Sequence, residues 1–313
     1  MLRYVGKRLL MVIPVLIGVS FLIYFIMDLA PGNAILMMAP DATTEQVEAL
    51  TKQYGYDRSV FYRYAIYIKG LLTGDLGTSI LFQEPVLDLY LQRLPATLKL
   101  ALGAIVVSHL ISLPLGIFAA THSGSLMDNG SMVLALIGLS MPNFWLGLLL
   151  ILFFSLGLGW FPSGGAEGFK SIILPAITVG TGHTAMLTRT TRSSMIDVIR
   201  QDYLRTARAK GVSEKKVIHK HALKNALIPI LTVSGTQLAG CLGGAVLTET
   251  VFAWPGVGRL IIDAVNQRDT PLVAGSIIMT TLLVSILLLI VDLLYAFIDP
   301  RIKAQYIRGG KKG

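Results

Sequence analysis

The sequence predicts an all-α membrane protein with six transmembrane helices. Only 14% of its 313 residues are charged and 53% are hydrophobic, whereas a soluble domain carries about 25% charged residues. The mean hydropathy is +0.66, and apolar runs of about 20 residues, long enough to cross a bilayer, recur along the chain. The net charge of +9 fits the positive-inside rule because basic residues border these runs. Nucleic acid is therefore not an expected partner.

The first expected span is Leu9–Met27, an uncharged run that follows Arg3, Lys7 and Arg8. It is too long for a signal peptide and no A-x-A-like cleavage site follows, so we expect it to be retained in the membrane. The other five expected spans are Leu98–Ala120, Ser131–Leu158, Ile172–Leu187, Ala226–Val251 and Leu272–Ile298.

Residues 31–95 are polar and are expected outside the membrane. Thr43–Lys52 and Ser59–Leu72 have the pattern of amphipathic helices, and the second carries three tyrosines suited to a membrane interface. Turns are predicted at Pro31-Gly32, Gly74-Asp75 and Glu84-Pro85. The chain should thus comprise an N-terminal span with an external region (1–95), a membrane domain (96–300) and a basic tail (301–313). The three interfacial tyrosines are Tyr62, Tyr64 and Tyr67.

The distribution of basic residues predicts that both termini are cytoplasmic. With six spans, 18 of the 27 Lys and Arg residues fall on the inner side, as the positive-inside rule requires. The loop Thr121–Gly130, also expected inside, contains no Lys or Arg. The large basic segment between the fourth and fifth spans outweighs that loop.

This basic segment, residues 200–229, predicts a docking element. Tyr203–Lys210 consists largely of good helix formers, and Gly211 can take the left-handed conformation that ends a helix. Ser213 occupies an N-cap position, with Glu214 in the first turn of a second helix. A helix, a glycine bend and a second helix would form a compact knob on the membrane domain.

No enzymatic motif is present. The sequence contains no phosphate-binding loop, nucleophile elbow or H-E-x-x-H zinc motif. The single cysteine, Cys241, lies in an apolar run and is read as a buried side chain. Ionisable residues inside membrane spans suggest function, but a hydrogen-bonded structural role is an equal alternative for the two histidines, and the aspartate is weighed as mainly structural. These residues are His109, His183 and Asp292.

Small residues recur every four positions in two spans. Gly235, Ala239 and Gly243 share one face of the fifth span, and Gly240 with Gly244 forms a G-x-x-x-G pair. The preceding span repeats the spacing with Ala176, Gly180 and Thr184. Such faces let helices approach closely, either within this chain or at a subunit interface.

Two interruptions of the apolar runs are candidate elements of a translocation path or gate. Met141, Pro142 and Asn143 place a helix break within the third run, where irregular backbone is tolerated if it lines a cavity; a simple kink is the alternative. The second interruption is an external turn that begins near the end of the fifth run. Its candidate residues are Glu249, Trp254, Pro255 and Gly256.

Motifs along nearly the whole chain resemble the permease subunits of binding-protein-dependent ABC importers, in the dipeptide, oligopeptide and nickel branch. They include MLRYVGKRLL at residues 1–10, Leu94-Pro95-Ala96-Thr97-Leu98, DYLRTARAKG at 202–211, TETVFAWPGVGR at 248–259 and Asp299-Pro300-Arg301.

The resemblance implies a type I ABC importer transmembrane domain whose cytoplasmic coupling helix docks on an ATPase subunit. The family's E-A-A-x-x-x-G signature corresponds to Arg205-Thr206-Ala207 followed by Gly211, so the acidic residue is absent and only the docking role is carried over. The implied coupling residues are Tyr203, Leu204, Arg205, Thr206, Ala207, Arg208, Ala209, Lys210, Gly211 and Val212.

The resemblance also implies partners and cargo. They are a homologous second permease, two ATPases that hold ATP and Mg, and an external solute-binding protein in a prokaryotic inner membrane. This chain would bind no cofactor and hydrolyse no ATP. Peptides are the expected cargo, and nickel or a metal chelate is the alternative.

Two other classes of function remain open. A secondary transporter should show inverted repeats and intramembrane coupling groups, and a membrane-anchored scaffold could use its basic segment to bind anionic lipid. Co-purification of ATPase subunits would distinguish these classes, and Ala207→Glu or Gly211→Pro should release the ATPases.

Overall fold

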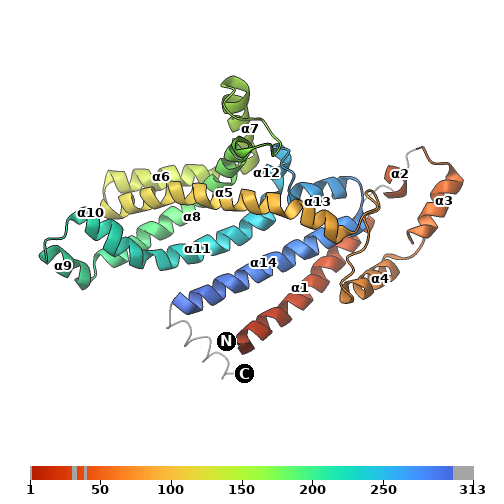
Figure 1. Ribbon diagram of the computed structural model, residues 1–313, viewed down its shortest axis with the longest axis horizontal. Coiled ribbons are helices and arrows are strands. Elements are labelled where there is room, and N and C mark those ends of the chain that lie inside the picture. Colours follow the sequence, from red (N-terminus) through yellow and green to blue (C-terminus); the bar gives the residue numbers. More distant parts are fainter. Residues whose placement is uncertain (1, 30–33, 39–40, 299–313) are drawn as a thin grey trace. The chain divides into compact units, whose positions relative to one another are not determined.

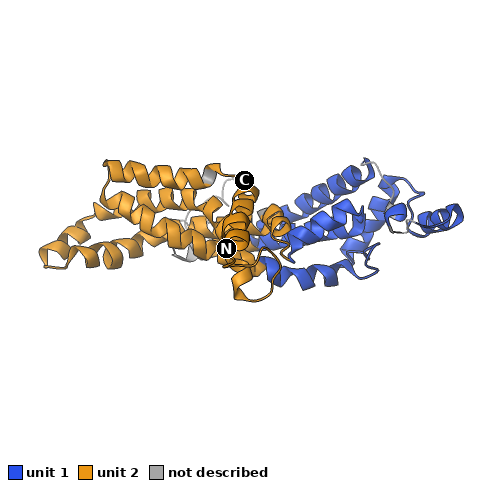
Figure 2. Cartoon of the chain, turned by 90° about the horizontal axis from the view of Figure 1, so that it is seen from above, with its two compact units in different colours: residues 1–97, 255–286 blue, residues 98–254, 287–313 orange. Residues whose placement is uncertain are grey.

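The computed structural model describes residues 2–29, 34–38 and 41–298, and these residues confirm the all-α prediction (Figure 1). Within them the only strand-like pairing is an isolated bridge between Thr78 and Pro85. The predicted Pro31-Gly32 turn and the tail 301–313 lie outside the described residues. The chain divides into two compact units, coloured in Figure 2: residues 1–97 with 255–286, and residues 98–254 with 287–313.

Unit 1 contains α1 (Leu2–Leu29), the short α2 (Ala34–Met38), α3 (Thr44–Gln53), α4 (Val60–Leu72) and α13 (Val257–Asn266). The two predicted amphipathic helices are confirmed as α3 and α4. Thr43 and Gln46 form a reciprocal capping box at the start of α3, which satisfies backbone donors that a helix start leaves free.

Aromatic rings join α1 to α4. The ring centroids of Tyr24 and Tyr67 lie 4.8 Å apart. Tyr62 is 54% exposed, as an interfacial residue should be, whereas Tyr67 is 7% exposed. The expectation that Tyr67 is interfacial is therefore wrong, because its ring faces α1 and packs into the core of unit 1.

A buried carboxylate holds the start of α14 (Thr270–Ile298) to the turn after residue 78. Asp269 is 1% exposed and accepts hydrogen bonds from Ser79 Oγ at 2.5 Å and from the backbone N–H groups of Leu81 and Leu272 at 3.1 Å. A buried charge is tolerated when hydrogen bonds satisfy it in this way.

Unit 2 is built around α8 (Ile173–Ile199), which packs against α5 (Val86–Thr121) and against four further helices. These are α6 (Leu126–Ser140), α7 (Asn143–Leu150), α11 (Leu223–Gly244) and α12 (Val246–Val251). The shorter elements of this unit are a π-helix at Ile151–Gly157, a 3₁₀ turn at Phe169–Ile172, α9 (Asp202–Ala209), α10 (Glu214–Lys216) and a second π-helix at Val217–Ala222. The helices α5 (Val86–Thr121) and α14 contribute residues to both units.

The predicted spans are present in the described residues. Five helices are long and apolar enough to cross a membrane, or six if a bent pair counts as one span. The bent pair is α6 with α7 and the π-helix after it, which turn by 90° around Met141 and Pro142. The predicted break in the third apolar run is thereby confirmed.

Two helices extend well beyond their apolar runs. The helix α5 begins at Val86 rather than Leu98, through a segment whose polar residues hid it from a hydropathy reading. The helix α8 continues to Ile199 rather than Leu187, because polar residues of its last turns are buried in unit 2; Thr191 is fully buried.

The small-residue faces pack within this chain at two points. A Cβ added to Gly180 would lie 2.7 Å from the Ala104 carbonyl oxygen of α5, and one added to Gly235 would lie 2.6 Å from Val291 of α14. Gly240 and Gly243 have no such neighbour within 4 Å. Packing within the chain therefore accounts for Gly180 and Gly235.

Replacing Gly180 with alanine should destabilise unit 2 by about 1–3 kcal/mol, because the added methyl group would overlap the α5 backbone. Gly240→Ala is the matched control, since the new Cβ would meet no atom within 4 Å. Thermal unfolding of the purified protein in detergent measures both. Equal unfolding midpoints for the two variants would contradict this close packing of α5 and α8.

Candidate functional site

The predicted helix–bend–helix knob is present. The helix α9 covers Asp202–Ala209, one residue offset from the predicted Tyr203–Lys210. Gly211 follows with φ +78°. Gly211 N donates to Arg208 O at 2.9 Å and Val212 N donates to Ala207 O at 3.2 Å. This pair of bonds is a Schellman motif, which needs the left-handed residue that glycine supplies, so the predicted role of Gly211 is confirmed.

The second helix of the knob begins where predicted. Ser213 is the N-cap of α10, although its side chain makes no capping hydrogen bond. Glu214 accepts hydrogen bonds from Arg208 Nε at 3.0 Å and Nη2 at 2.8 Å. This bidentate contact joins α9 to α10 and fixes the geometry of the hairpin. We call residues 202–216 the α9 hairpin.

A single leucine anchors the α9 hairpin to the membrane domain. Leu204 is fully buried, and Ala207 and Val212 pack against the same apolar cluster. That cluster gathers the ends of α5, α8 and α11 with the π-helix: Ala120, Met195, Val217, Ile218, Ala222 and Ala226. The sequence analysis named Leu204 only as a docking residue. Leu204 is the one large aliphatic residue in α9, and this isolated apolar position could have identified it as the residue that holds the hairpin.

The outer face of α9 is open. The Arg205 side chain is 84% exposed, Tyr203 is 41% exposed, and Thr206, Ala209 and Lys210 are also exposed. Tyr203 Oη accepts a hydrogen bond from Asn225 Nδ2 at 2.6 Å, which ties the helix to α11. The hairpin therefore presents a small, charged surface on a fixed base.

An ion pair that the sequence did not reveal joins α8 to the start of α6. Arg192 of α8 donates from Nε and Nη2 to the two carboxylate oxygens of Asp128 at 2.5 and 2.6 Å. The Asp128 side chain is 3% exposed and that of Arg192 is 29% exposed. Gly124 N donates a further bond to Asp128. The partners are 64 positions apart, so no local pattern could reveal the pair.

Of the predicted path residues, Met141 and Pro142 line a hollow of about 650 Å³ together with Trp145. The Asn143 side chain faces Gly182 of α8, since a Cβ there would lie 2.9 Å from its Oδ1. A role for Met141, Pro142 and Asn143 in a translocation path stays a prediction.

The residues predicted at the external turn fall in both units. Glu249 is fully buried and Trp254 is 3% exposed, and both belong to unit 2, as Met141–Asn143 do. Pro255 and Gly256 belong to unit 1. A gating role for these four residues likewise stays a prediction.

The two intramembrane histidines join other helices to α11. His109 Nε2 lies 2.8 Å from Ser234 Oγ, and His183 Nε2 lies 3.1 Å from Cys241 Sγ. His109 Nδ1 also donates to the Ile105 carbonyl oxygen at 2.7 Å. These contacts favour the structural alternative for both histidines. Asp292 is half-buried in α14.

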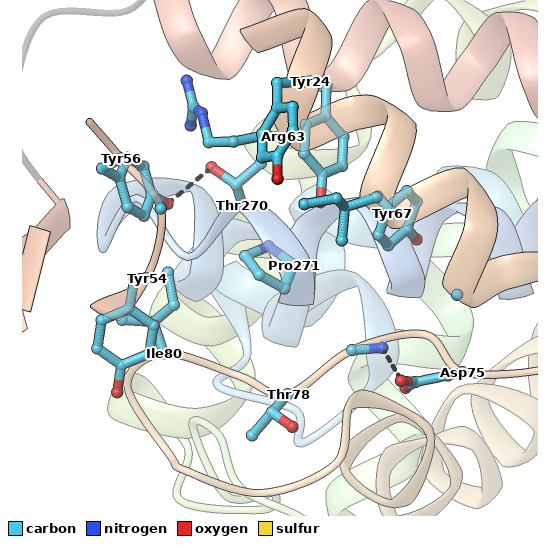
Figure 3. A pocket seen from close by; sticks show the side chains of 15 residues that line it. Tyr24, Tyr54, Tyr56, Arg63, Tyr67, Asp75, Thr78, Ile80, Thr270 and Pro271 are labelled. Carbon is cyan, nitrogen blue, oxygen red and sulfur yellow. Dashed lines mark hydrogen bonds between the residues drawn. The ribbon is translucent and has the colours of Figure 1, made fainter. Parts of the chain in front are cut away.

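Unit 1 contains a hollow of about 290 Å³ with aromatic walls (Figure 3). The Arg63 guanidinium lies 4.8 Å from the ring centroid of Tyr56 and pairs with Asp28. Burial raises the pKa of the Tyr56 and Tyr67 phenols. Across the described part of the chain, no group of three or more His, Cys, Asp or Glu side chains could hold a metal ion. The tyrosines that line the hollow are Tyr24, Tyr54, Tyr56, Tyr62 and Tyr67.

The spans define a multi-pass helical membrane protein that carries the polar α9 hairpin. The chain belongs to the family described as binding-protein-dependent transport system inner membrane component, which matches residues 112–304. The N-terminal region of the same family matches residues 1–101. The resemblance seen in the sequence is thereby confirmed, and the protein is a permease component of the inner membrane.

Three similar proteins illustrate the relationship. The oligopeptide transport system permease AppB of Bacillus subtilis (strain 168) is 41% identical over 97% of this chain and 100% of its own length. The di/tripeptide permease DppB of Pseudomonas aeruginosa (strain UCBPP-PA14) is 40% identical with the same coverage. The glutathione permease GsiC of Escherichia coli (strain K12) is 41% identical over 97% of this chain and 99% of its own length.

A solved structure supports the fold. The inward-facing MetNI methionine ABC transporter aligns with a TM-score of 0.57 at 17% identity, over 68% of this chain and 97% of the solved chain. The predicted type I ABC importer transmembrane fold is therefore confirmed.

Proposed function

We propose that this chain is the permease subunit of an ATP-driven importer of peptides that an external solute-binding protein delivers. The observation that carries the cargo class is the set of relatives named above, whose systems are described as transporting oligopeptides, di- and tripeptides and glutathione. Nickel or a metal chelate, the alternative cargo of this branch, has less support from these relatives.

Within the α9 hairpin, α9 and the bend that follows it are proposed as the contact with the ATPase. The exposed face of α9 can enter a cleft because Ala209 keeps that face slim, while its buried face is fixed to the ends of three spans through Leu204. A displacement of α9 would therefore be transmitted directly to α5, α8 and α11, because no flexible linker lies between them. Residues 203–212 form the proposed coupling site.

The proposed assembly follows from this role. Two ATPase subunits bind ATP and Mg and hydrolyse the nucleotide, a homologous second permease completes the path, and both termini of this chain lie in the cytoplasm. A secondary transporter, the alternative class, would move its cargo without nucleotide. Peptide uptake into proteoliposomes with and without ATP separates the two.

Charge reversal on the outer face of α9 tests the coupling site. Lys210→Glu should release the ATPase subunits in detergent and abolish ATP-driven uptake, whereas Lys216→Glu, the same kind of change on exposed α10, should leave the complex intact. These variants suit the test better than Ala207→Glu, because Ala207 packs against the buried cluster and a glutamate there would disturb the fold as well. Retention of the ATPases by Lys210→Glu would refute the docking surface.

A further inference from the structure

A groove of about 520 Å³ lies beside the α9 hairpin. One wall is the end of α5, and the other is α10 with the π-helix that follows it. Its floor is apolar, and Phe118 in that floor is 43% exposed. The apolar lining residues are Leu113, Pro114, Ile117, Phe118 and Ile218.

The rim of the groove carries net positive charge. Lys215 and His219 line it and are exposed. His219 Nδ1 donates to the Lys215 carbonyl oxygen at 3.1 Å, a bond that does not involve Nε2. Glu214 is the only carboxylate among the lining residues, and Arg208 pairs with both of its oxygens. The carboxylate is thus neutralised within the chain while the two basic side chains face the groove.

The groove changes from apolar to polar along the axis of a membrane span. The helix α5 ends at Thr121, so Leu113 lies about 12 Å deeper at 1.5 Å per residue. The deep part is lined by Leu113, Pro114 and Ile117, and the shallow part by Thr121, Lys215 and His219. A phospholipid has the same order of polarity, with acyl chains below and a phosphate at the surface.

We propose that this groove binds one anionic phospholipid. Its phosphate would pair with Lys215 and His219, and an acyl chain would lie against Phe118 and Ile117. Basic pockets between spans on the cytoplasmic side are suited to anionic headgroups, and a zwitterionic headgroup would bring its own cation towards these basic groups. Because α10 follows α9 across the Gly211 bend, the lipid would also link the α9 hairpin to the end of α5.

Lipid binding to the purified transporter tests the site. Native mass spectrometry would follow a titration with phosphatidylglycerol or with phosphatidylcholine of the same acyl chains. We expect phosphatidylglycerol to be retained more strongly, and Lys215→Gln to weaken its binding about fivefold, the effect of losing one basic residue near a headgroup. Phe118→Ser should weaken binding of both lipids.

Lys216→Gln is the matched control, because Lys216 is exposed and adjacent but does not line the groove. Equal losses in Lys215→Gln and Lys216→Gln would show diffuse attraction and overturn the site, as would equal retention of the two lipids. A photo-crosslinker in place of Phe118 should capture lipid; capture of an ATPase or a second permease would show that a protein covers the groove and would also overturn the proposal. Lys215 is exposed, so these variants should keep the thermal unfolding midpoint of the parent.

Discussion

Replacing Arg192 with methionine should destabilise unit 2 by about 2–3 kcal/mol, since it leaves the buried Asp128 carboxylate without its cationic partner. The expected loss lies below that of a fully buried pair for two reasons. The Arg192 side chain is 29% exposed, and Gly124 N still donates to Asp128 at a helix start that favours negative charge. Thermal or denaturant unfolding of the purified protein would measure the loss.

Two further variants make this prediction specific. Arg189→Met is the same substitution one helical turn earlier, at an exposed position, and should change stability little. Asp128→Asn combined with Arg192→Met should be more stable than the sum of the single losses implies, because no unpaired charge then remains. If Arg192→Met unfolds at the same midpoint as Arg189→Met, the ion pair contributes nothing to the fold.

The parts of the fold that could be predicted from the sequence are those fixed by local chemistry. Gly211 is one example, because the left-handed bend after α9 requires a residue without a Cβ. The break at Pro142 is another, since proline cannot continue a regular helix through that point. The apolar runs likewise gave the spans, because a bilayer sets their length and polarity.

Features that depend on distant partners could not be predicted. Asp128 and Arg192 meet only after α6 and α8 pack together, and the residues after Val86 join α5 because Val86 and Tyr90 are buried in unit 1. The contact between His183 and Cys241 likewise joins residues 58 positions apart. Hydropathy and spacing describe one segment at a time and contain no information on such contacts.

Leu204→Ala should detach the α9 hairpin while leaving the spans folded. Removing a fully buried leucine side chain costs about 2–5 kcal/mol, and this cost falls on a helix of eight residues that is too short to be stable alone. Hydrogen exchange should therefore increase in residues 202–216 but change little in α8 and α11. Under the proposed function, the ATPase subunits should also dissociate from the Leu204→Ala variant.

Leu174→Ala separates loss of the anchor from a general loss of stability. Leu174 is 2% exposed and lies at the opposite end of α8, so its truncation should lower stability by a similar amount without exposing α9. Equal hydrogen exchange of residues 202–216 in both variants would contradict an anchoring role for Leu204. If the hairpin loosens in Leu204→Ala while the ATPases stay bound, the anchor stands and the docking surface must lie elsewhere. The two readouts therefore test how α9 is held independently of what it binds.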